Sequence, residues 1–97
     1  MTQSQQIVDE VIQSGLFDGE YYRKATGLAF SEIGLAVKHY LDVGCTLGYS
    51  PGPLFDTSHY LESYPDVRIS GVNPLLHFIR NGRRENRVPL PSSRRHI

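Results

Sequence analysis

Two hexapeptides decide the fold of this chain: Phe17-Asp18-Gly19-Glu20-Tyr21-Tyr22 and Phe55-Asp56-Thr57-Ser58-His59-Tyr60. They stand 38 residues apart, and the same offset continues without a gap through the segments that follow them. A period of this length is typical of repeats in which each copy is one supersecondary unit that stacks on its neighbour. The sequence therefore predicts a small all-α module, with an N-terminal helix followed by two helix-pair repeats.

The offset also relates histidines, glycines, prolines and apolar residues further along the chain. The matched pairs are His39 with His77, Tyr40 with Phe78, Leu41 with Ile79, Gly44 with Gly82, Pro51 with Pro89 and Pro53 with Pro91. We expect a capping helix over 1–16, a degenerate first repeat over 17–54, a second repeat over 55–91 and a basic tail over 92–97.

The first helix of each repeat is expected to begin after an aspartate. Asp18 and Asp56 can accept hydrogen bonds from the free N–H groups of the first turn, and the preceding phenylalanines can pack as hydrophobic staples. Pro65 should stop this helix in the second repeat, because proline disfavours a helical conformation in the residue before it. Gly27 should stop it in the first repeat.

The second helix is clearest in the second repeat. Asn73 can cap it, Pro74 suits the first helical position, and an apolar stripe follows at Leu75, Phe78 and Ile79. The same face of the first repeat is expected to contain Ile33, Val37, Tyr40 and Leu41.

Glycines and asparagine mark the ends of these helices. Gly44 and Gly82 are expected to be left-handed residues that end the second helix of each repeat. Gly48 aligns with Asn86, and these are the two residue types that most readily adopt a positive φ. We therefore expect a turn with a left-handed residue at both positions.

An additional helix is expected ahead of the first repeat. Ile7, Val8, Val11 and Ile12 recur at the spacing of one helical face, with Ser4 as its expected cap and Gly15 as its expected stop. Two repeats alone leave a stacking face open, so this helix is expected to cover one end of the pair. The far end has no such cover.

The second repeat follows a recognisable order: FD-x-x-x-YL at 55–61, PDV at 65–67, G-x-N-PL-x-HF at 71–78 and G-x-x-E-x-R at 82–87. This order resembles a short tandem repeat found in and beside bacterial glycosyltransferases and surface-polysaccharide biosynthesis proteins. Asn86 stands where that pattern has glycine, and the first repeat lacks the PDV and NPL elements. The resemblance implies a non-catalytic interaction or scaffolding module, with a protein partner or self-association.

The paired histidines and the aromatic residues each allow two interpretations, one as a chemical site and one as part of the structure. His39 and His77 could belong to a metal or acid-base site, but repetition favours half-buried imidazoles that bond to a backbone carbonyl or an aspartate. The aromatic residues could stack on sugar rings, and core packing explains them more simply. The chain has no glycine-rich phosphate loop and no nucleotide-binding fingerprint, so we expect no cofactor and no catalysis.

The single cysteine, the start of the chain and its hydropathy restrict the classes of protein to which the chain can belong. Cys45 is the only cysteine, which excludes an intramolecular disulfide and a thiolate zinc site within one chain, and its position after a helix predicts a raised thiol pKa. The start of the chain lacks the pattern of a secretory signal, and no apolar stretch is long enough to span a membrane. These features predict a cytoplasmic protein.

Arginine is concentrated at the C-terminal end. Ten acidic and ten basic residues give no net charge, yet six of the basic residues follow residue 79. They could dock on an acidic protein face, an anionic surface or nucleic acid, since the guanidinium group donates paired hydrogen bonds to carboxylates and phosphates. The candidate interaction residues in the second repeat are Arg80, Arg83, Arg84 and Arg87, and Arg94 and Arg95 belong to the tail.

Overall fold

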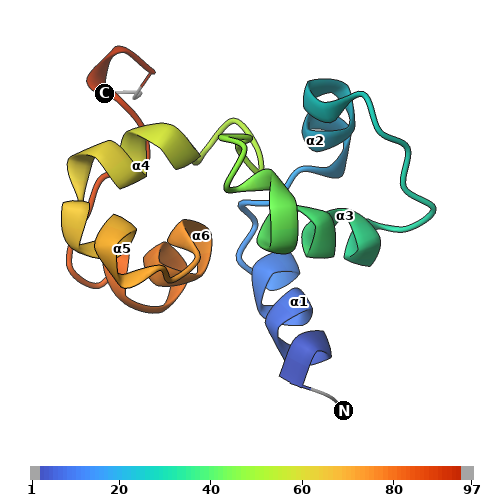
Figure 1. Ribbon diagram of the computed structural model, residues 1–97, viewed down its shortest axis with the longest axis horizontal. Helices are drawn as coiled ribbons and strands as arrows, with labels where there is room; N and C mark the ends of the chain where they lie inside the picture. Colours follow the sequence, from blue (N-terminus) through green and yellow to red (C-terminus); the bar gives the residue numbers. More distant parts are fainter. Residues whose placement is uncertain (1–2, 95–97) are drawn as a thin grey trace.

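The computed structural model describes residues 3–94 and is all-α. The first unit contains α2 (Gly19–Thr26), α3 (Ile33–His39) and a π-helical turn, η1 (Tyr40–Gly44), and the second contains α4 (Thr57–Ser63), α5 (Pro65–Ser70), α6 (Pro74–His77) and η2 (Phe78–Gly82). Figure 1 shows the two units side by side, with α1 (Gln3–Gln13) at the lower edge between them. A short 3₁₀ turn, η3 (Ser92–Arg94), ends the described chain; residues 95–97 of the predicted tail lie outside it.

The beginning of each unit is built as the sequence predicts. Asp18 accepts a hydrogen bond from the Tyr21 N–H at 3.1 Å, and Asp56 accepts one from the His59 N–H at 2.8 Å. The staple phenylalanines pack on the tyrosines one turn further on, with ring centroids 5.3 Å apart in the first unit and 5.1 Å in the second. The repeated FD dipeptide therefore starts both units by the same local interactions.

Each unit also closes on itself. The Asp18 N–H donates to the Pro51 carbonyl and the Asp56 N–H donates to the Pro89 carbonyl, both at 2.9 Å. The turns that make this return possible contain Gly48 at φ 87° and Asn86 at φ 59°, so the predicted left-handed residues are confirmed. The last segment of a unit thus lies against its first residue.

The second unit contains one helix more than the sequence predicted. Pro65 does end α4, whose last residue is Ser63, but it is also the first residue of α5. A proline is well suited to that position because the first N–H groups of a helix have no partner within the helix. In the first unit, α2 ends at Gly27 (φ 75°) as expected, and no helix is assigned between 27 and 32.

α6 begins as the sequence predicts. The Asn73 side chain accepts hydrogen bonds from the N–H groups of Leu75 and Leu76, and Pro74 is the first residue of the helix. Its counterpart α3 buries Val37 and the Tyr40 that follows, whereas Ile33 is 44% exposed and does not continue the buried face.

α1 differs from expectation at its start and in its contacts. Ser4 lies inside the helix rather than capping it, because α1 already includes Gln3. α1 packs on α3 through its apolar face, and Gly15 follows it with φ 78°. Glu10 and the Ser14 carbonyl also contact arginines of the second unit, so α1 joins both units and does not simply cover an end.

The two units meet through a small set of polar contacts. The Tyr40 hydroxyl hydrogen-bonds the Thr57 Oγ1 at 2.8 Å, and both side chains are fully buried. The Ser50 Oγ accepts from the Thr57 N–H at 3.2 Å, and the Asn73 amide donates to the Cys45 Sγ at 3.3 Å. These contacts fix the first unit against the start of α4 and α6.

Candidate functional site

The paired histidines each hold a buried tyrosine. His39 Nδ1 lies 2.7 Å from the Tyr22 hydroxyl, and His77 Nδ1 lies 2.8 Å from the Tyr60 hydroxyl. Burial is the main cause that raises the pKa of both tyrosines to about 12, so the hydroxyls stay protonated at neutral pH. The predicted partner was a backbone carbonyl or an aspartate, and the structure corrects it to a tyrosine of the same unit.

The paired glycines complete these clusters, and their predicted conformation was wrong. Gly44 and Gly82 are the last residues of the π-helical turns, and neither has a positive φ. Instead, a Cβ atom at either position would overlap the tyrosine hydroxyl of its own unit. Glycine is required here because the hydroxyl occupies the place of a side chain, and we call each Tyr–His–Gly set the unit's core cluster.

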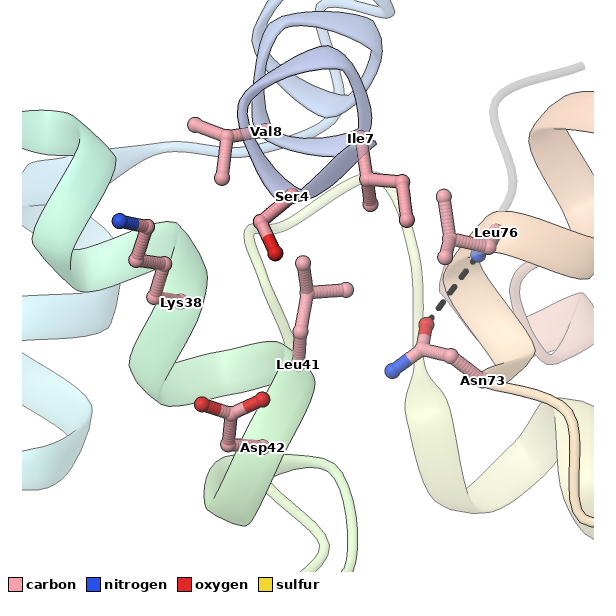
Figure 2. A pocket seen from close by; sticks show the side chains of 8 residues that line it. All are labelled: Ser4, Ile7, Val8, Lys38, Leu41, Asp42, Asn73 and Leu76. Atoms are coloured by element: carbon pink, nitrogen blue, oxygen red, sulfur yellow. Dashed lines mark hydrogen bonds between the residues drawn. The ribbon is translucent and has the colours of Figure 1, made fainter. Parts of the chain in front are cut away.

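A hollow lies where three parts of the chain meet. We call it the junction groove, and its volume is about 360 Å³. Figure 2 shows its lining, which comes from α1, from the end of α3 and η1, and from the start of α6: Ser4, Ile7, Val8, Lys38, Leu41, Asp42, Asn73 and Leu76. Four of the eight lining side chains are aliphatic, and the other four offer one cation, one carboxylate, an amide and a hydroxyl.

The charges of the junction groove follow from a difference between the repeats. Lys38 is exposed, whereas Leu76 at the equivalent position of the second unit is buried. Lys38 and Asp42 form no ion pair within residues 3–94. The sequence pattern does not predict this groove, because the groove depends on where α1 packs.

All four candidate arginines make hydrogen bonds within the chain, and two of them, Arg80 and Arg87, form ion pairs. Arg80 makes two hydrogen bonds to Glu10, at 2.9 and 2.7 Å, and Arg83 donates to the Ser14 carbonyl at 3.0 Å. Arg87 makes two hydrogen bonds to Asp66, pairs with Glu85, and lies over the Tyr64 ring with its guanidinium carbon 4.7 Å from the ring centroid. Arg84 is exposed and donates to the Asn81 side chain.

The Glu10–Arg80 pair gives a testable pH dependence. The hydrogen bond from Arg80 lowers the pKa of Glu10 below its usual 4.5, so the pair stabilises the fold above the unfolded-state pKa and loses that effect as the pH falls. Both side chains are partly exposed, and we expect Glu10→Gln to lower the free energy of unfolding by only about 0.5 kcal/mol at neutral pH.

Urea unfolding at neutral and acidic pH checks this expectation, with the exposed Glu62→Gln as the matched variant. The difference between wild type and Glu10→Gln should vanish once the pH lies below the pKa of the folded protein's Glu10. A difference that is unchanged in acid, or that Glu62→Gln reproduces, would show that the ion pair is not its source.

Cys45 is placed at the contact between the units and not at a reactive surface. Its side chain is buried, its thiol donates to the Leu41 carbonyl at 3.6 Å, and the Asn73 amide lies against the sulfur. The pKa of the thiol is raised, and burial is the main cause. The sequence-based prediction had the same direction but named the helix end as the cause. This environment favours the protonated thiol.

The described residues were also compared with the requirements of a metal site and of a membrane-spanning helix, and the chain with known proteins. Residues 3–94 contain no group of three or more His, Cys, Asp or Glu side chains placed to hold a metal ion. Within the same range, no helix combines the length and the apolar character needed to cross a membrane. Comparison with family models, curated proteins and solved structures found no match to this chain.

Proposed function

We propose that this chain is a non-catalytic interaction or scaffolding module that acts in the bacterial cytoplasm beside glycosyltransferases or other proteins of surface-polysaccharide assembly. The observation that carries the proposal is that the side chains bonded inside the protein and the side chains exposed at the groove are different sets. The histidines and buried tyrosines are the groups best suited to chemistry, and they bond to other side chains inside the protein: Tyr22 with His39 and Tyr60 with His77 within the units, and Tyr40 with Thr57 between them. The exposed Lys38 and Asp42, by contrast, line the junction groove together with aliphatic side chains.

The junction groove has the composition expected of a protein contact. Aliphatic side chains from three elements form its interior, and Lys38 and Asp42 stand at its border without an internal ion pair among the described residues. A partner side chain that fills the hollow would bury apolar surface, while the charges would select its orientation. The resemblance of the second repeat to glycosyltransferase-associated repeats supplies the biological setting of the proposal.

Capture with matched variants tests this function. Tagged wild-type protein would be co-expressed with the products of the neighbouring genes, next to Leu41→Gln in the groove and Leu47→Gln, an exposed leucine that does not line it. We expect wild type and Leu47→Gln to retain a surface-polysaccharide assembly protein and Leu41→Gln to lose it. Equal capture by all three proteins, or capture of unrelated proteins only, would contradict the proposal.

Binding of an anionic surface or nucleic acid is a second proposal, and Arg84 is the observation in its favour. This arginine is exposed and contacts only a neutral side chain among the hydrogen bonds of the described residues, so its charge is available. Arg84→Glu should then weaken salt-sensitive binding to vesicles with anionic lipid or to duplex DNA. Unchanged binding would remove this alternative, and the ion pairs that Arg80 and Arg87 already form within the chain favour the first proposal.

A further inference from the structure

We infer that the groove between α1 and α3 is a self-association surface, in which two copies of the chain pack α3 against α3 antiparallel about a two-fold axis at Leu35. The inference rests on the proposed interaction function and names a partner for it, a second copy of this chain. It concerns a different hollow from the junction groove, although Val8 and Lys38 border both.

α3 exposes apolar side chains beside a hollow. Ile33 is 44% exposed and Leu35 is 43% exposed. Both line a groove of about 230 Å³ between α3 and α1, whose other lining residues are Gln5, Val8, Ile12, Glu32, Gly34 and Lys38. Gly34 has no side chain to fill this groove, so an incoming aliphatic side chain can reach the apolar residues behind it.

The charges along α3 are self-complementary. Glu32 stands three residues before Leu35, and Lys38 stands three residues after it. Glu32 occupies the cap position of α3 yet its side chain makes no capping hydrogen bond, and neither Glu32 nor Lys38 belongs to an ion pair within residues 3–94. Both charges are therefore available to a partner.

Symmetry converts this spacing into a specific contact. In an isologous dimer, every contact occurs twice. If one residue of the first copy contacts a second residue of the partner, that second residue of the first copy also contacts the first residue of the partner. An antiparallel crossing centred on Leu35 places each Glu32 opposite the partner's Lys38, and Leu35 opposite the partner's Leu35. The crossing forms two identical ion pairs around an apolar centre, and a parallel crossing would instead bring like charges together.

Charge-reversal variants test the pairing directly. Sedimentation equilibrium of the purified chain from micromolar to millimolar concentration should show a monomer–dimer equilibrium. Glu32→Lys and Lys38→Glu should each weaken the dimer by roughly 10- to 100-fold, because each dimer contains the altered pair twice. The double variant Glu32→Lys/Lys38→Glu restores opposite charges and should dimerise like wild type.

Mixing the two single variants gives the decisive measurement. The heterodimer of Glu32→Lys with Lys38→Glu has two attractive pairs, so the mixture should associate more tightly than either variant alone. Circular dichroism confirms that each variant is folded, and Leu41→Gln, at a residue that lines the junction groove but not the groove between α1 and α3, should dimerise normally. A monomeric wild type, a double variant no tighter than the singles, no gain on mixing, or equal loss in Leu41→Gln would each overturn the inference.

These outcomes are separate from those of the capture experiment. A monomeric chain that still captures a polysaccharide-assembly protein through Leu41 would overturn self-association and leave the proposed function standing. A dimeric chain that captures no such protein would contradict the proposed function alone.

Discussion

Gly44→Ala is expected to lower the free energy of unfolding by about 3 kcal/mol, at the upper end of the usual cost of an overpacked core. The new methyl group would overlap the Tyr22 hydroxyl, which cannot turn aside without breaking its bond to His39. The backbone at Gly44 is an ordinary right-handed one, so the loss would come from this overlap and not from backbone strain. Urea unfolding monitored by circular dichroism measures the change.

Two further variants identify the cause. Gly34→Ala adds a methyl group in α3, where the nearest side-chain atom would be Val8 Cγ1 at 3.7 Å, and it should leave stability unchanged or raise it by about 0.5 kcal/mol. Tyr22→Phe removes the overlapping oxygen, so Gly44→Ala should cost at least about 1 kcal/mol less in that background than in wild type. Strict additivity of the two changes would show that the hydroxyl does not require the glycine.

Tyr40→Phe is expected to lower the free energy of unfolding by about 2 kcal/mol. The lost hydroxyl is the partner of the Thr57 Oγ1, and Thr57 is fully buried at the contact between the units. The ring itself should be retained, because the second unit has a buried phenylalanine, Phe78, at the equivalent position. The cost therefore measures a polar group left without its bond in the interior.

Removing both partners should recover much of that loss. In Tyr40→Phe/Thr57→Val, no polar side chain remains unpaired, and the double variant should be more stable than Tyr40→Phe alone. Tyr21→Phe, at a half-buried position, should change stability by less than about 0.5 kcal/mol. A double variant less stable than Tyr40→Phe would show that the hydrogen bond is not the origin of the effect.

Local signals in the sequence predicted much of the fold. The aspartate caps, the staple phenylalanines and the Asn73-Pro74 start of α6 each depend on neighbours within five residues, and each is present as expected. α5 was missed because Pro65 was interpreted only as a stop, although proline is equally suited to the first turn of a new helix. The sequence itself contains that signal, since Gly71 then ends α5 with φ 78°.

Contacts between distant segments could not be predicted in the same way. Tyr22, His39 and Gly44 recur as a set in the second unit, but their contact depends on how α2 packs on α3, which no local pattern specifies. The partner of Arg80 lies in α1 and that of Arg83 directly after it, 70 and 69 residues earlier in the chain. The junction groove depends on the same packing, so its lining could not be assembled from periodicity alone.

Each unit is closed by a hydrogen bond between its end and its beginning, and this closure affects how the number of repeats can change. Since the hydrogen bonds from Asp18 to Pro51 and from Asp56 to Pro89 are completed inside a single unit, nothing in that closure depends on how many units follow. Duplication or loss of a whole 38-residue segment would leave every remaining loop intact. A gene that encodes this design can therefore change the length of its product in complete steps.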